Sequence, residues 1–209
     1  YEVLFALDQI DEIALQGVGN FMDYEVVDAA KENADLGETS EEEKEAEEKA
    51  KEELKETTEF LKATLGARVD KVAVSSRLET SPSALVQPQW GMSPQMQRFM
   101  KAQAAAAGDD MGAMGGMASN LEVNPKHEVV RKLKDMVAAG DAQQATAKAY
   151  AELLYDVAAV SSGYELGDTA AFAKRIVALM SGGDDALGAL ADEEAPAEGP
   201  PPADPATGA

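Results

Sequence analysis

The chain has no cysteine and a single histidine among its 209 residues. Without cysteine there are no disulfides, thiolate zinc sites or cysteine nucleophiles. One histidine cannot build a histidine-based metal site, so we interpret His127 as a structural or surface residue. The carboxylates fall mostly on solvated helix faces, where nothing tunes a pKa for catalysis. We therefore expect no catalytic, metal-binding or cofactor-binding residues in this chain.

Basic residues are also scarce, with 18 Lys and Arg against 39 Asp and Glu and a formal net charge of −21. Binding to nucleic acid phosphates needs clustered positive charge, so a nucleic-acid partner is excluded. No apolar run approaches the ~20 residues of a membrane-spanning helix, so we expect no membrane partner. No signal or transit peptide is recognisable. Because the chain begins within an apolar run, we interpret it as a fragment.

The first 37 residues have the pattern of a βαβ unit. An apolar run over 1–7 predicts a strand covered on both faces, Asp8 can cap a helix after it, and 24–29 predicts a second strand. Two strands do not make a stable parallel sheet, so we expect the remaining strands to lie upstream. We assign residues 1–37 to the end of a preceding α/β domain.

A charge-rich helix opens the next unit, residues 38–182. Thr39 and Ser40 each precede a glutamate by three residues, which is the pattern of a capping box. Apolar residues then recur at helical spacing up to Gly66, so we predict one long helix with a solvated charged face. The alternative is an acidic segment that binds basic partners.

Strand patterns and further helices follow, which makes residues 38–182 an α+β domain with a small mixed sheet. Alternation over 69–78, a turn around Pro82 and an apolar return over 84–87 predict a β-hairpin, and 121–123 predicts another strand. Asn124 and Pro125 predict the start of a further helix.

A short helix over 93–103 follows the hairpin, with Ser93 as its cap and Pro94 at its first position. Its apolar side chains are mostly Met and aromatic, which adapt to varied partners because thioether chains are flexible and polarizable. We predict an exposed surface for non-native client proteins; the alternative is that Met96 and Met100 pack on Val72 and Val74. The predicted client-binding residues are Trp90, Met92, Met96, Phe99 and Met100.

Two helices are predicted between residues 141 and 180, capped by Asp141 and Asp168 and ended by Gly163 and by the pair at 182–183. The first carries two apolar stripes, and one domain usually needs only one. A symmetric dimer with a four-helix bundle would bury the surplus; the alternative is that both stripes bury in a larger core of the same chain. The predicted dimerisation residues are Tyr150, Leu153, Leu154, Val157, Phe172, Ile176, Leu179 and Met180.

The last segment, residues 183–209, contains five prolines, seven acidic residues and no basic residue from Asp184 onward. Such a composition cannot bury enough apolar surface to offset the entropy of ordering. We therefore predict a disordered acidic tail that can be removed from Asp184 without loss of fold or dimerisation.

Several motifs resemble those of one chaperone family, the ninety-kilodalton heat-shock proteins (heat shock protein 90). The segment from 152 to 176 resembles the family's closing segment, and 75–86 resembles its Arg-Leu, Ser-Pro, Leu-Val hairpin. The Asn-Pro-Lys-His run at 124–127 resembles its Asn-Pro-x-His signature, and 7–16 resembles the end of its middle domain. The resemblance covers most of residues 1–181.

The resemblance implies a homodimeric, ATP-dependent chaperone that binds unfolded protein and serves protein folding in the stress response. It places residues 1–37 at the C-terminal end of the middle domain and residues 38–182 in the C-terminal dimerisation domain. The family binds ATP and Mg in a separate N-terminal domain, so the resemblance implies that the ATPase residues lie upstream and that this chain hydrolyses no ATP by itself.

The final residues, Pro-Ala-Thr-Gly-Ala, lack the Met-Glu-Glu-Val-Asp and Lys-Asp-Glu-Leu endings of other branches of this family. The resemblance therefore implies no tetratricopeptide docking through the C-terminus and co-chaperones of organelle type. The sequences of 1–16 and 99–103 are most similar to those of plastid members, and this resemblance implies a location in the chloroplast stroma. A mitochondrion or the bacterial cytoplasm is the alternative location. An acidic helical scaffold without client binding and an enzyme domain are the other functions that we weigh.

Overall fold

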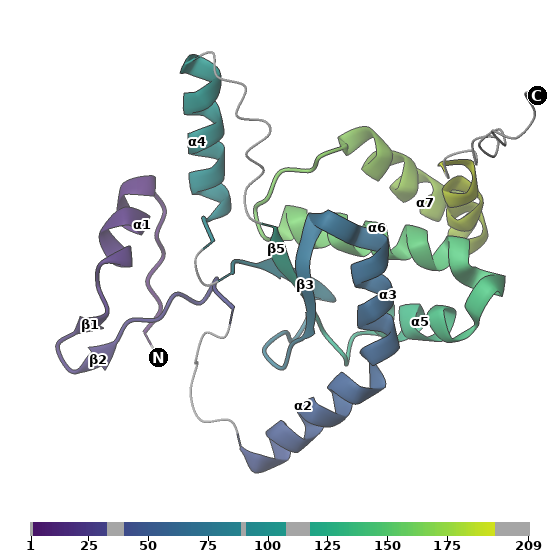
Figure 1. Cartoon of the computed structure of the whole chain (residues 1–209), viewed down its shortest axis with the longest axis horizontal. Helices are drawn as coiled ribbons and strands as arrows, with labels where there is room; N and C mark the ends of the chain where they lie inside the picture. The colour runs from purple at the N-terminus through teal and green to yellow at the C-terminus, as the bar shows by residue number, and fades with distance from the viewer. Residues whose placement is uncertain (1, 33–39, 89–90, 108–117, 195–209) are drawn as a thin grey trace, which may run out of the picture.

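The computed structural model describes residues 2–32, 40–88, 91–107 and 118–194, arranged as in Figure 1. Its mixed helices and small sheets confirm the α+β class. The helices are α1 (Gln9–Gln16), α2 (Glu41–Glu53), α3 (Lys55–Leu65), α4 (Pro94–Ala107), α5 (Glu128–Ala138), α6 (Gln144–Ser161) and α7 (Thr169–Glu194). The strands are β1 (Asn20–Phe21), β2 (Tyr24–Glu25), β3 (Val69–Val74), β4 (Ser83–Val86) and β5 (Ser119–Val123).

The larger sheet has three strands in the order β3-β5-β4. β5 pairs parallel with β3 and antiparallel with β4, so it separates the two strands that the sequence predicts as a hairpin. The hairpin prediction is wrong because the fully buried side chains of Leu121 and Val123 favour the centre of the sheet for β5.

The core lies between this sheet and the helices that pack on it. α3 packs on β3, α6 packs on β4, and α5 contacts both helices (Figure 1). Leu61 and Leu65 of α3 belong to the predicted apolar stripe, and both are buried. The side chains that are fully buried in the core include Leu61, Leu121, Val123, Val130, Leu133 and Ala151.

The first 32 residues do not form a βαβ unit. Residues 2–7 have no strand partner among the described residues, and the side chains of Val3, Leu4 and Phe5 are largely exposed. α1 forms as predicted after Asp8, but β2 pairs antiparallel with β1 in a two-residue-per-strand hairpin. The prediction fails because a strand needs a hydrogen-bonding neighbour, which the described residues do not supply for 2–7.

The charge-rich helix begins with the predicted capping box. The Ser40 Oγ accepts from the backbone N–H of Glu43, and a carboxylate oxygen of Glu43 accepts from the backbone N–H of Ser40. The predicted single helix is broken at Leu54, where φ is −100° and ψ is 6°, so α2 and α3 are separate. The break turns the buried Leu54 side chain into the core.

The start of α5 lies three residues later than the sequence predicts. Asn124 is buried, its amide donates to the carbonyls of Glu79 and Ser81, and its Oδ1 accepts from the N–H of Lys126. These bonds hold a turn instead of a helix. The His127 Nδ1 accepts from the Val129 N–H and caps α5, so the lone histidine has a structural role.

The two C-terminal helices pack against each other. Asp168 caps α7 as predicted, because its Oδ1 accepts from the N–H of Ala171 at 2.9 Å. Asp141 does not cap α6; it lies in a 3₁₀ turn over Gly140–Gln143. Gly163 ends α6 at a φ of 80°, which is the left-handed region that glycine favours.

Residues 184–194 are helical, not disordered. α7 contains a kink at Gly183, where φ is 63°, and then continues as a helix to Glu194. Leu187 is fully buried in the core and holds this second part of α7 on the domain. The prediction of disorder is therefore wrong for 184–194, and its remainder, 195–209, lies outside the described residues.

Candidate functional site

Helix α4 extends away from the sheet and from α5–α7, and α1 is its neighbour in Figure 1. Its N-terminus is fixed as predicted, because the Ser93 Oγ accepts from the Met96 N–H at 3.0 Å. The same hydroxyl donates to a carboxylate oxygen of Glu12 on α1. Near the middle of the helix, Lys101 pairs with Glu165 at 3.0 Å. Polar contacts at two points therefore position this helix.

Most large apolar side chains of α4, and that of Met92 two residues before it, are exposed. Met92, Phe99 and Met100 are 52%, 43% and 40% exposed, and Met96 is half-buried. The alternative of packing on β3 has little room, because Val72 and Val74 already pack in the core. Trp90, the other predicted client-binding residue, lies outside the described residues. The structure thus brings four of the five candidate residues onto one projecting segment.

The predicted dimerisation residues fall into three groups. Tyr150, Leu153 and Leu154 are buried within the chain's own core, so for them the alternative of burial in the same chain is correct. The outward-facing residues are Val157 and Met180, and the half-buried ones that pack against the core are Phe172, Ile176 and Leu179.

Two further apolar residues, Val160 and Val177, are exposed beside the predicted ones. Val177 and Met180 are 62% and 81% exposed and lie three residues apart on α7. Val157 and Val160 have the same spacing on α6. The spacing of Val177 three residues before Met180 could have identified it as part of the same helix face. The sequence does not show, however, which apolar stripe packs on the sheet.

A buried charge network joins α6 to α7. Arg175 donates to Asp156 at 3.0 Å and to Glu152, which also accepts from Arg68 at 3.3 Å. Burial raises the pKa of Asp156, and the positive charge of Arg175 opposes that rise. A buried carboxylate needs such a partner, so this network fixes the register of the two helices.

A second cluster joins α5, α6 and the end of α7. Lys132 donates to the Tyr150 hydroxyl at 2.8 Å and pairs with Asp184, and the Tyr150 hydroxyl also donates to Asp184. The hydrogen bond from Lys132 lowers the pKa of Asp184, and burial raises the pKa of Tyr150. The cluster holds the chain after the Gly183 kink against the domain.

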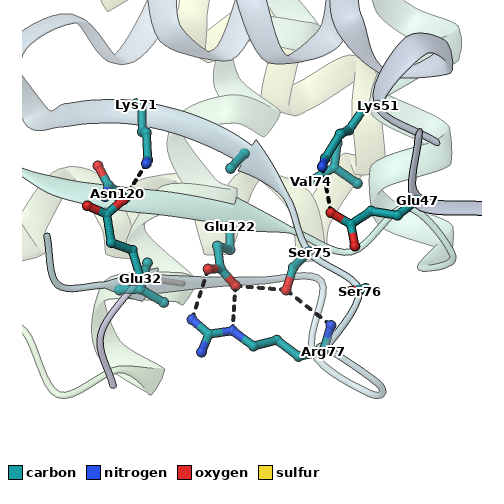
Figure 2. A pocket seen from close by; sticks show the side chains of 12 residues that line it. Glu32, Glu47, Lys51, Lys71, Val74, Ser75, Ser76, Arg77, Asn120 and Glu122 are labelled. Carbon is teal, nitrogen blue, oxygen red and sulfur yellow. Dashed lines mark hydrogen bonds and ion pairs between the residues drawn. The ribbon is translucent and has the colours of Figure 1, made fainter. Parts of the chain in front are cut away.

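A pocket of about 240 Å³ lies on the sheet side of α2, and three ion pairs line it (Figure 2). Arg77 pairs with Glu122, Lys71 with Glu32, and Lys51 with Glu47 at 2.6 Å. The hydrogen bond from Lys51 lowers the pKa of Glu47. Because each of these charges has a partner of opposite sign, the three acidic and three basic side chains give the pocket lining no net charge.

No group of three or more His, Cys, Asp or Glu side chains within the described ranges is arranged to hold a metal ion. Among the helices that the structure describes, none has the length and apolar composition to cross a membrane. The arrangement instead offers two apolar surfaces, on α4 and on α6–α7, and a polar pocket.

Comparison with known proteins identifies the class. Residues 1–202 match the family described as Hsp90 protein. The chain is similar to the chaperone protein HtpG of Burkholderia lata, with 38% identity over 86% of this chain and 26% of that protein. It is also similar to the endoplasmin homolog of Caenorhabditis elegans, with 37% identity over 86% of this chain and 24% of that protein. The chloroplastic heat shock protein 90-5 of Arabidopsis thaliana is 35% identical over 86% of this chain and 22% of its own length.

This chain therefore belongs to the Hsp90 family. It spans about a quarter of the length of these three relatives. Its relatives include proteins named for the chloroplast and for the mitochondrion as well as bacterial HtpG.

Proposed function

We propose that this chain is the C-terminal dimerisation and client-binding part of an ATP-dependent Hsp90 chaperone. The observation that carries the proposal is α4, which projects from the domain with Met92, Phe99 and Met100 exposed. Exposed large apolar side chains in one place mark a surface for apolar partners, and unfolded proteins are such partners. Methionine suits this role because its flexible thioether adapts to different sequences.

The exposed apolar residues have polar neighbours. Lys101, directly after Met100, pairs with Glu165, and Ser93, directly after Met92, contacts Glu12. A polar rim around an apolar centre is typical of sites that bind protein segments reversibly. By resemblance to the family, ATP and Mg would act in a separate domain, so this part would bind clients without hydrolysing ATP.

Replacing Phe99 and Met100 with serine is expected to abolish most client holding and leave the fold intact. Both side chains are at least 40% exposed, so the free energy of unfolding should change by roughly 0.5 kcal/mol or less. Suppression of the aggregation of an unfolded model protein, measured beside urea melts, checks both statements. Phe60→Ser is the matched control, because that half-buried phenylalanine packs against the core.

A double variant that unfolds at much lower urea and still holds clients would contradict this assignment. An unchanged melt with unchanged client holding would contradict it as well, whereas no client holding by the parent protein would favour the acidic scaffold, which explains the net charge of −21 without any client surface. The projecting apolar residues of α4 favour the chaperone over that scaffold.

The proposal includes a homodimer formed through the outer faces of α6 and α7. Val157, Val160, Val177 and Met180 remain exposed on these helices. Two copies packed through this face would give the four-helix arrangement. The revised set omits Tyr150, Leu153 and Leu154, because the chain's own core already buries them.

Replacing Val177 and Met180 with glutamate is expected to convert the dimer to a folded monomer. The two carboxylates would lie unpaired in a symmetric interface, where burying a charge is unfavourable, but would be solvated in the monomer. Sedimentation at tens of micromolar measures the mass, and circular dichroism checks the fold. The exposed polar residue Lys174 supplies the control variant K174E. A wild-type monomer at this concentration would refute the dimer.

For location and partners we propose the chloroplast stroma, with co-chaperones of organelle type. The similarity to the chloroplastic protein of Arabidopsis supports the location, although mitochondrial and bacterial relatives are similarly close. Detection of the protein in purified plastids, with mitochondria as the comparison fraction, tests it; recovery in mitochondria alone would overturn it.

A further inference from the structure

We infer that Arg77 clamps residues 28–32 onto the sheet and thereby holds α1 beside the client-binding helix α4. Residues 28–32, which we call the strap, connect the α1 region to the rest of the chain. The inference concerns regulation of the proposed client surface, and in that respect it rests on the proposed function. The clamp itself is a structural claim that can be tested without any client.

The guanidinium of Arg77 makes contacts in two directions. Its Nε and Nη2 donate to the two carboxylate oxygens of Glu122 on β5 at 3.0 and 2.9 Å. Its Nη1 donates to the Ala29 carbonyl at 3.2 Å, and Nη2 also donates to the Lys31 carbonyl at 3.3 Å. One planar side chain therefore binds the sheet and the strap at once, which a lysine could not reproduce.

The carboxylate of Glu122 is itself oriented by a third group. The Ser75 hydroxyl donates to it at 2.7 Å, and both Ser75 and Glu122 are buried (Figure 2). A buried carboxylate with a two-pronged arginine and a hydroxyl donor is well satisfied, so its geometry is well defined. The clamp therefore presents the guanidinium to the strap in a fixed position.

The strap contributes its own matching groups. The Glu32 N–H donates to the Gln87 carbonyl at 2.9 Å, and the Gln87 N–H donates to the Ala30 carbonyl at 3.0 Å. The Glu32 side chain accepts from Asn120 at 2.9 Å and pairs with Lys71. The strap thus joins the residue after β4 through a parallel β-bridge between Lys31 and Gln87, and the ion pair of Glu32 with Lys71 holds its C-terminal end.

The position of α1 follows from this docking. Beyond the strap, α1 contacts α4 through the Ser93 hydroxyl on Glu12 and through the Gln95 amide on the Leu7 carbonyl at 3.3 Å. These two polar contacts are weak when alone because water competes for each group. A docked strap keeps α1 close enough to make them; a released strap would let α1 leave and expose more of α4.

Hydrogen exchange of the whole chain tests the clamp directly. The double variant R77M/E122Q removes the ion pair without leaving a buried unpaired carboxylate. We expect the amides of Glu32 and Gln87 to exchange about tenfold faster or more, while those of α5 and α6 change little. Arg131→Met is the control, since the exposed Arg131 donates to the Lys126 carbonyl near its own helix start. Unchanged protection of Glu32 and Gln87 in R77M/E122Q would overturn the clamp.

The absence of cysteine from the chain allows the movement of α1 to be measured. Spin labels on cysteines introduced at the exposed positions Ile13 and Gln103 report the α1–α4 separation. We expect a single distance in the parent and a broader, longer distribution in R77M/E122Q and at raised salt, which weakens partly exposed charge pairs. The same distribution in both proteins would overturn the coupling of the strap to α1.

Client holding completes the test. With α1 released, R77M/E122Q should hold an unfolded model protein several-fold better, and F99S/M100S added to it should remove the gain. Unchanged holding in R77M/E122Q despite a released strap would overturn the regulatory role. Holding that is insensitive to F99S/M100S would overturn the proposed function instead, while the exchange and distance measurements would still decide the clamp.

Discussion

Truncation of the chain after Gly183 is expected to destabilise the domain by several kcal/mol. The deletion removes Leu187, which is fully buried in the core, and loss of one buried leucine side chain costs ~2–5 kcal/mol. It also removes Asp184, which leaves Lys132 and the Tyr150 hydroxyl without their shared acceptor. Urea unfolding followed by circular dichroism measures the loss. The sequence alone predicts no loss of stability on this truncation, so the measurement distinguishes a disordered tail from a helix that packs on the core.

A shorter truncation after Glu194 is the control for this prediction. It removes only 195–209, keeps all of α7, and is expected to change the free energy of unfolding by roughly 0.5 kcal/mol or less. The single variant Leu187→Ala should reproduce much of the effect of the longer deletion, with a cost of ~2–5 kcal/mol. Equal unfolding midpoints for the two truncations would show that the chain after the Gly183 kink does not contribute to the fold.

Replacing Leu154 with glutamate is expected to unfold the domain instead of producing folded monomers. Leu154 lies in the core beneath β4, where the Ser83 hydroxyl donates to its carbonyl at 3.2 Å. A carboxylate there would have no charged partner, and the change would also remove a large apolar side chain. The combined cost exceeds ~4 kcal/mol, a large part of the ~5–15 kcal/mol that stabilises a typical domain. Circular dichroism should show loss of helix at room temperature or a greatly lowered melting point.

Val157→Glu is the matched control, because Val157 lies on the same helix three residues further on and its side chain is exposed. It should keep the fold and act only on the oligomeric state. A folded monomer from L154E would mean that Leu154 lies in the dimer interface after all, as its apolar stripe alone suggests. A folded dimer would contradict both interpretations of this residue.

Local signals in the sequence were sufficient for the elements whose ends are set within a few residues. The capping box at Ser40, the cap at Asp168, the cap at Ser93 and the end of α6 at Gly163 are all confirmed. Each depends on a side chain or a φ angle that acts over three or four residues, so neighbours in the chain decide the outcome. The family match also confirms the motif resemblance to the Hsp90 family. Such motifs are short stretches of consecutive residues, so they can be recognised without the tertiary structure.

The pairing of the strands was decided by the tertiary structure. Nothing in 69–87 shows that β5, more than thirty residues away, enters between β3 and β4. Strand neighbours are chosen by long-range burial, and the short apolar run of β5 is compatible with a central or an edge position. The Arg77 clamp depends on this order, because it joins β5 to the strap, and so it could not be predicted from the sequence.

The tertiary structure also determines which surfaces cover the apolar stripes of α6. The periodicity of α6 shows that two stripes need cover, and a partner subunit or a sheet can supply it equally well. Here α7, α5 and the sheet cover Tyr150, Leu153 and Leu154, which leaves only the outer residues for a second copy. Composition likewise misjudged 184–194, because one leucine placed in a preformed core offsets a polar, acidic sequence that would not fold alone. Sequence thus determines which residues must be buried, and only the assembled fold determines against what.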